Sequence, residues 1–100
     1  MLTTITTSSQ ALSAILTAAQ ITQISPSSYT SSLYSDGVYK LIIQNLGAQD
    51  IYVEFGGAAT TTGWIKITTD NSFTFTDVSL SRTYLISASA NNTNVRISAN

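Results

Sequence analysis

The stretch Leu41–Gly57, LIIQNLGAQDIYVEFGG, contains two short runs in which apolar and polar residues alternate, joined by a polar loop and closed by two glycines. Successive side chains of a strand point to opposite faces, so each run has one apolar face. The six residues predicted to face the core are Tyr39, Leu41, Ile43, Ile51, Val53 and Phe55. The stretch therefore predicts a β-hairpin that packs on an all-β core.

The two runs also predict a register for this hairpin. If Ile43 lies opposite Ile51, then Lys40 lies opposite Glu54 on the outer face, and the loop is centred on Gly47. We expect Gly47 to supply the positive φ that tight hairpin loops need. The pairing of Lys40 with Glu54 is expected to be a surface contact worth under about 1 kcal/mol.

Four further alternating runs of strand length follow: GWIKITTD, NSFTFTDV, TYLISASA and TNVRISAN. Turn-forming residues separate them, most clearly at residues 70–72 and at Asn91-Asn92, while residues 35–37 open the first strong strand. Short strands at intervals of about 8–12 residues are typical of antiparallel sandwiches and small barrels. The residues predicted to complete the core are Phe73, Phe75, Tyr84, Ile86, Ala88, Val95 and Ile97.

The fold class predicted is thus all-β: a single small antiparallel β-sandwich, or a barrel-like domain, of about seven or eight strands with an N-terminal arm. A chain of 100 residues is long enough for one modest core. We divide it into residues 1–35, with the arm, the first strands and a Ser-rich loop, and residues 36–100, with the sandwich core.

The first 35 residues carry two conflicting patterns. TTITTS favours a strand, whereas Leu12, Ile15, Leu16 and Ala19 have helical spacing, with Ser8 or Ser9 as a possible N-cap. We favour the strand interpretation. Residues 25–35, SPSSYTSSLYS, predict a loop or an extended arm. Its Tyr29 and Tyr34 either dock on a neighbouring subunit or cover this protein's own core.

Composition argues against several classes of function. The chain has no cysteine and no histidine, which removes disulfides, thiol chemistry and His-based catalysis. Charged residues make up 9% with a net charge of −1, and the four basic residues are scattered, so we expect no nucleic-acid partner. Threonine and serine together number 31 of 100 residues, which is consistent with a plain β protein or with a subunit of an assembly.

No pattern for catalysis or cofactor binding is visible. The five carboxylates have neither the spacing of a calcium loop nor the pairing of a metal site. Gly56 and Gly57 are not followed by the lysine and helix of a phosphate loop, and we expect them to bend the chain out of the strand that ends at Phe55. We expect no enzymatic activity, no cofactor and no metal.

The single tryptophan, Trp64, is the most prominent candidate binding residue. With Tyr52 and Tyr84 it could form an aromatic platform for a sugar ring, as in small carbohydrate-binding β-sandwich modules. The other interpretation places Trp64 at the edge of the core or in a seam between subunits. Together with Tyr29 and Tyr34, it is a candidate interface residue.

The N-terminal segment does not match an export or membrane signal. It lacks a positive n-region, and Ser13 and Thr17 interrupt its apolar part. It is too short and too polar to span a bilayer, so we expect no membrane association. The chain is therefore expected to be made in the cytoplasm and to stay out of the Sec pathway.

The stretch at residues 39–63, YKLIIQNLGAQDIYVEFGGAATTTG, resembles a pattern in small tailed-phage virion proteins. The residues that carry the resemblance are Asn45, Gly47, Val53, Phe55, Gly56 and the loop 58–62, and the likeness extends over roughly residues 39 to 98. It implies a capsid decoration or cement protein that binds the major capsid protein on the virion exterior, with a trimer favoured. The alternative function is a binding module, either a phage tail or fibre component or a small carbohydrate-binding β-sandwich. No catalytic residue is implied.

Overall fold

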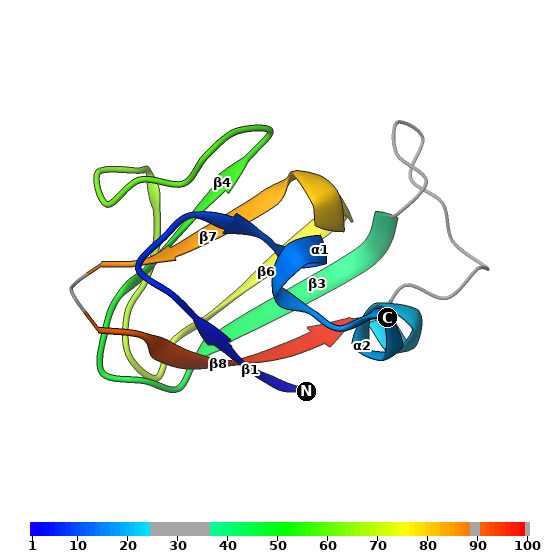
Figure 1. Ribbon diagram of the computed structural model, residues 1–100, viewed down its shortest axis with the longest axis horizontal. Coiled ribbons are helices and arrows are strands. Elements are labelled where there is room, and N and C mark those ends of the chain that lie inside the picture. The colour runs from blue at the N-terminus through cyan, green and yellow to red at the C-terminus, as the bar shows by residue number, and fades with distance from the viewer. Residues whose placement is uncertain (25–36, 89–90, 100) are drawn as a thin grey trace.

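Two four-stranded antiparallel sheets face each other in the computed structural model, which describes residues 1–24, 37–88 and 91–99 (Figure 1). One sheet has the strand order β1-β8-β3-β6 and the other β2-β7-β4-β5. The bounds are β1 Leu2–Ile5, β2 Gln10–Ala11, β3 Gly37–Asn45, β4 Ile51–Phe55, β5 Ile65–Ile67, β6 Ser72–Ser79, β7 Thr83–Ser87 and β8 Thr93–Ala99. The predicted all-β sandwich is confirmed.

The order of the strands defines the topology. Among the described strands, β4 and β5 are the only consecutive pair that lies in one sheet; every other step along the chain passes to the opposite sheet. Eight strands wound alternately through two four-stranded sheets in this order form a jelly roll, an architecture found in viral capsid and lectin domains.

The predicted hairpin between β3 and β4 is wrong. β3 pairs with β6 and β8, whereas β4 pairs with β5 and β7, so the two strands lie in different sheets. Lys40 is opposite Thr76, and Glu54 is opposite Tyr84, which rules out the expected contact between Lys40 and Glu54. The loop at residues 46–50 is therefore an arch that carries the chain from one sheet to the other.

The buried face of each run agrees with its alternation in most places. Leu41, Ile43, Ile51 and Val53 are at most 1% exposed and belong to one core cluster. The prediction for Phe55 is wrong, because this side chain is 38% exposed. The side chain of Tyr39 lies outside the described part of the chain.

Strand β7 faces the core with the opposite set of residues from the predicted one. Leu85 is fully buried, and Thr83 and Ser87 are buried beside it. Tyr84 and Ile86 are only half-buried, on the outer face. Either set of side chains alternates with a period of two. The set that faces the core contains two small hydroxyl residues, Thr83 and Ser87, so choosing the more hydrophobic set gave the wrong face.

Asn45, at the end of β3, joins both sheets through its buried side chain. Its Nδ2 donates to the carbonyl oxygens of Gln49 (2.6 Å) and Ile67 (2.9 Å). Its Oδ1 accepts from the Gly47 amide (3.1 Å) and the Thr93 hydroxyl (3.3 Å). Because Ile67 is on β5 and Thr93 on β8, one amide group fixes the arch against strands of opposite sheets.

Gly47 serves a different purpose from the one expected. Its φ is not positive; among the described glycines Gly56 alone has a positive φ, of 80°. A Cβ at Gly47 would collide with the Thr93 hydroxyl and lie 2.8 Å from the backbone nitrogen of Asn94. Gly47 is thus needed for close approach of the arch to β8. At Gly56 the positive φ turns the chain where β4 ends, as predicted.

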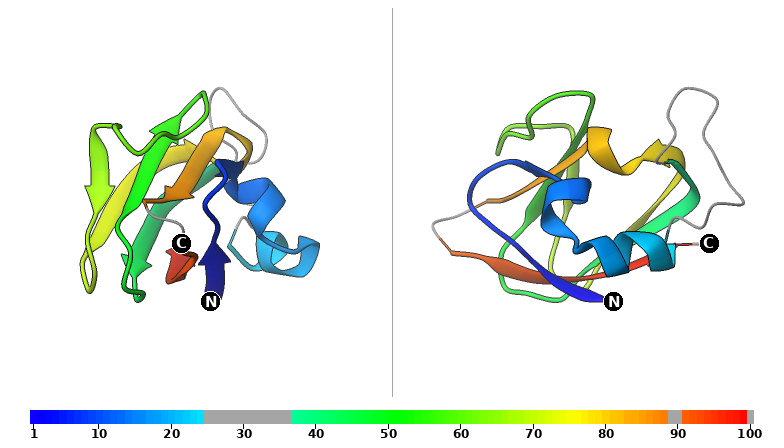
Figure 2. Two further views of the ribbon diagram at one scale, coloured as in Figure 1. Left: turned by 60° about the vertical axis from the view of Figure 1, so that its left-hand side comes forward. Right: turned by 45° about the vertical axis from the view of Figure 1, so that its right-hand side comes forward.

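Residues 1–24 belong to the sandwich. β1 pairs with β8 and β2 pairs with β7. Two short helices follow, α1 (Leu12–Ile15) and α2 (Ala18–Ile24), and the left view of Figure 2 shows them on the side of the sandwich away from β5 and β6. The core residues contributed by this segment are Ile5, Leu12, Leu16 and Ile24. The Ser-rich part of the predicted arm lies outside the described residues.

The helix starts differ from the predicted cap. α1 begins after Ala11 with no side-chain cap, so neither Ser8 nor Ser9 caps it. Ser9 instead accepts a hydrogen bond from the Ala59 amide (2.8 Å). Ahead of α2, the Thr17 hydroxyl accepts from the Gln20 amide (3.2 Å), and the Gln20 side chain accepts from the Thr17 amide (2.9 Å), which is a capping box.

Candidate functional site

The flank formed by β5 and β6 is incompletely covered. β5 has three residues and β6 has eight, and the two strands are edge strands of the facing sheets. Phe73 lies opposite Ile43 on β3, and Phe75 lies opposite Leu41, so both rings are on the face that carries the core. Phe73 is nevertheless 44% exposed, so the prediction that it is a core residue is wrong.

All three phenylalanines of the chain gather at this flank in what we call the aromatic row, Phe55, Phe75 and Phe73. The Phe55 and Phe75 ring centroids are 5.2 Å apart in an edge-to-face arrangement, with an interplanar angle of 73°. Phe73 stacks on Phe75 with centroids 5.7 Å apart. Both arrangements are favourable for aromatic pairs, so the row is held in place while its two ends remain exposed.

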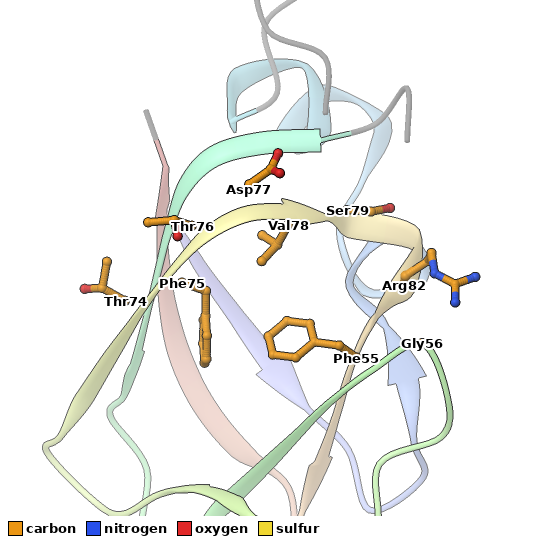
Figure 3. A pocket seen from close by; sticks show the side chains of 9 residues that line it. All are labelled: Phe55, Gly56, Thr74, Phe75, Thr76, Asp77, Val78, Ser79 and Arg82. Carbon is orange, nitrogen blue, oxygen red and sulfur yellow. The ribbon is translucent and has the colours of Figure 1, made fainter. Parts of the chain in front are cut away.

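A groove of about 540 Å³ opens beside the aromatic row (Figure 3). Its walls are Phe55 and Gly56 at the end of β4, the β6 residues 74–79, and Arg82 in the 3₁₀ turn Leu80–Arg82. In Figure 3 the Phe55 ring points toward Phe75, while Arg82 points away from both rings. A volume of this size is within the range of small-molecule and peptide-binding clefts.

Backbone conformation shapes the upper wall of the groove. Asp77 has a φ of 52°, in the left-handed region that is uncommon for non-glycine residues. Phe75 and Val78, three positions apart, are both turned inward, which a regular strand with a two-residue period does not allow. Asp77 lies between them and shifts the alternation, so that Val78 closes the groove above Phe55 (Figure 3).

The end of the groove at Gly56 is fixed by a backbone contact. The Gly56 amide donates to the Arg82 carbonyl oxygen (2.7 Å), which ties the end of β4 to the 3₁₀ turn. A Cβ at Gly56 would lie 3.0 Å from a guanidinium nitrogen of Arg82, in addition to the strain imposed by the positive φ. The lining is mostly aromatic, aliphatic and hydroxyl groups, with one acidic and one basic side chain. The groove therefore presents apolar rings next to hydroxyl and charged groups.

Within residues 1–24, 37–88 and 91–99, no group of three or more His, Cys, Asp or Glu side chains could hold a metal ion. None of the helices in these ranges is long and apolar enough to cross a bilayer.

Trp64 is fully exposed, so the interpretation that it fills the edge of the core is wrong. It immediately precedes β5, and the neighbouring Gly63 lies against Tyr52, with a Cβ at Gly63 placed 4.0 Å from the Tyr52 Cδ1. Tyr52 lies opposite Lys66 and Ile86 on the outer face of its sheet.

Tyr84 lies on the same outer face as Tyr52, opposite Glu54. The three residues of the predicted platform, Trp64, Tyr52 and Tyr84, thus occur on one sheet and its adjoining loop. The other predicted interface residues, Tyr29 and Tyr34, lie outside the described part of the chain.

Comparison of the chain with protein-family models, curated proteins and solved structures found no match. The resemblance to phage virion proteins therefore rests on the sequence pattern of residues 39 to 98. Within that pattern Asn45 and Gly47 have structural tasks in the arch, and Phe55 and Gly56 line the groove.

Proposed function

We propose that this protein is a structural subunit of a bacteriophage virion, a decoration or cement protein that binds the major capsid protein and stabilises the shell. The observation that carries the proposal is the aromatic row beside the groove, a contiguous apolar surface whose two end rings, Phe55 and Phe73, are exposed. Contiguous exposed apolar patches mark interaction sites, whereas single exposed apolar residues are ordinary.

The character of the surface supports attachment through apolar contact. With a net charge of −1 and few charged residues, the protein has little electrostatic means of attracting or repelling a shell. The jelly-roll topology agrees with this role, since capsid domains use it, although lectin domains use it too. A decoration protein is present in many copies, so a modest interface at each site is reinforced by repeated attachment.

Attachment is tested by adding the purified protein to shells of a candidate phage that lack their decoration protein, and measuring cosedimentation and negative-stain images. Burying the exposed 38% of the Phe55 ring contributes about 2 kcal/mol, from roughly 80 Å² at about 25 cal/mol per Å². Phe55→Ser is therefore expected to weaken binding about 30-fold.

Leu46→Ser is the matched control. Leu46 is 36% exposed, comparable with Phe55, but it lies on the arch and not in the groove. The Leu46→Ser variant should bind shells as tightly as the unchanged protein does. Equal loss of binding in both variants, or no binding of the unchanged protein to any shell, would contradict the proposal. Circular dichroism of each variant establishes that the fold is retained.

A second function, carbohydrate binding, is favoured by one observation: Trp64 is fully exposed beside a sheet face that carries Tyr52 and Tyr84. Exposed tryptophan rings stack on the apolar faces of sugars. Titration with oligosaccharides should then change Trp64 fluorescence, Trp64→Ala should abolish binding in calorimetry, and Phe55→Ser should leave it intact. Fluorescence unaffected by a broad set of glycans would exclude this function.

A further inference from the structure

Three of the four sheet edges are short. The edge strands β1, β2 and β5 have four, two and three residues, and β5 carries Lys66. Short edges and edge lysines are the usual means by which proteins prevent strands from pairing with other chains. The fourth edge strand, β6, has eight residues, and its first five, Ser72–Thr76, include neither charge nor proline. β6 is thus the one long unprotected edge among the described strands.

The same five residues are accessible. Ser72, Phe73, Thr74 and Thr76 are exposed, and Phe75 is half-buried. In Figure 3, Thr74 and Thr76 point away from the rings, so the hydroxyl face and the aromatic face of β6 are separate. A strand added along this edge would gain main-chain hydrogen bonds and would also cover Phe73.

We propose that β6 pairs with β6 of a second copy of this chain, antiparallel and related by a two-fold axis through Thr74. The segment S-F-T-F-T has the same pattern of hydroxyl and aromatic residues in both directions about Thr74, as a self-complementary two-fold interface requires. This register places Phe73 of each copy opposite Phe75 of the other, which makes two Phe73–Phe75 pairs. It also places Thr74 opposite Thr74 of the second copy; both kinds of cross-strand pair are stabilising.

The neighbouring register is less favourable. An axis through Phe75 would put Phe73 opposite Asp77, burying a carboxylate against a ring. Asp77, with its positive φ, also ends the regular extended stretch. In the Thr74 register it lies beyond the paired residues. The net charge of −1 opposes association only weakly.

This pairing goes beyond the proposed function and uses part of the same aromatic row: it covers Phe73 and Phe75, whereas shell attachment is tested at Phe55. A two-fold axis perpendicular to the sheet places the aromatic faces of both β6 strands on the same side of the sheet. The two aromatic rows would then meet at the centre of a continuous eight-stranded sheet. The resemblance to virion proteins implies a trimer, whereas edge pairing of β6 produces a dimer. The two assemblies can therefore be distinguished by their mass.

The first measurement is light scattering on the purified full chain, with no shell or glycan present. A dimer of the 10.6 kDa chain supports the proposal, and a monomer at millimolar concentration or a trimer overturns it. Thr74→Lys places two like charges opposite each other on the axis, and should weaken dimerisation at least tenfold. Thr4→Lys adds the same charge to the short edge strand β1 and should remain dimeric.

Cysteine cross-linking tests the register, because the chain has no cysteine of its own. Directly opposite residues have Cβ atoms about 4.5–5.5 Å apart, close to disulfide distance. Thr74→Cys should therefore form a disulfide-linked dimer under mild oxidation. Thr76→Cys, on the same face, would be about 13 Å from its equivalent and should not. Failure of Thr74→Cys to cross-link, or equal cross-linking of both variants, overturns the proposed pairing even if Thr74→Lys does not fold.

Discussion

Replacing Asn45 by alanine is expected to be the most damaging change of a single polar side chain in the arch. The side chain is fully buried, and it makes four hydrogen bonds, two as donor and two as acceptor. Its partners at the Ile67 carbonyl and the Thr93 hydroxyl belong to residues that are 0% and 3% exposed, so water cannot readily replace the lost bonds.

The magnitude follows from the two buried partners. Leaving a buried donor or acceptor without a partner costs about 1–3 kcal/mol, so Asn45→Ala should lower the free energy of unfolding by about 3 kcal/mol. A domain of this size has a total stability of about 5–15 kcal/mol. The loss corresponds to a fall in Tm of roughly 12–24 °C. Asn45→Asp keeps the shape but faces two carbonyl oxygens with a carboxylate, and should be at least as damaging.

The assay is urea unfolding followed by far-ultraviolet circular dichroism, because Trp64 is fully exposed in the folded state and its fluorescence is a poor probe of unfolding. With a slope of about 1–1.5 kcal/mol per M, the midpoint should fall by about 2–3 M. Asn92→Ala, at an exposed position, is the control and should change stability by less than about 0.5 kcal/mol. A loss below about 1 kcal/mol for Asn45→Ala would refute the assignment of Asn45 as the link between the sheets.

Three further outcomes are expected. Deleting residues 1–24 removes β1, β2 and four core side chains, whose burial contributes about 6–12 kcal/mol, comparable with the whole stability of the domain. The truncated chain should therefore show no cooperative unfolding transition, and a folded product would contradict this expectation. Gly47→Ala should destabilise the protein by about 2 kcal/mol or more in urea unfolding because its Cβ would collide with Thr93, whereas Gly57→Ala, with open space around it, should be close to neutral. Fluorescence of Trp64 should be quenched by acrylamide as strongly as that of a free tryptophan amide, and a protected, blue-shifted emission would show that the ring is covered.

The positions of the strands could be predicted from the sequence, but their pairing could not. Alternation with a period of two identifies a strand and its buried face, and it does so equally for a hairpin and for an arch. The choice between them at residues 46–50 depends on long-range bonds, chiefly that from Asn45 to Ile67, 22 residues away. A polar residue in a turn-like stretch gives no indication of its distant partner.

More of the N-terminal structure could be predicted from the sequence than from the spacing of its apolar residues alone. The favoured strand interpretation is confirmed at Leu2–Ile5, which covers the start of TTITTS, and is wrong for Leu12–Ile15 and Ala18–Ile24, where the helical spacing gave the correct structure. The capping box of Thr17 and Gln20 could have been identified from its spacing alone. The aromatic row could not, because the alternation of β6 places Phe73 and Phe75 on the core face and does not indicate that Phe73 is exposed there.

The exposed aromatic residues are not a consequence of loose packing. Within the described ranges, no buried side-chain nitrogen or oxygen lacks a hydrogen-bond partner, and the core side chains of both sheets are almost completely covered. The interior is thus satisfied, yet Phe55 and Phe73 are exposed on either side of the half-buried Phe75, so the apolar surface of this flank is only partly covered by the protein's own strands. Trp64 is a single ring with no apolar neighbour of comparable exposure on its loop, and isolated exposed rings are common. The aromatic row and the open edge of β6 coincide on the same flank, where main-chain and apolar contacts can form together. We therefore rank that flank above the Trp64 face as the surface through which this protein associates.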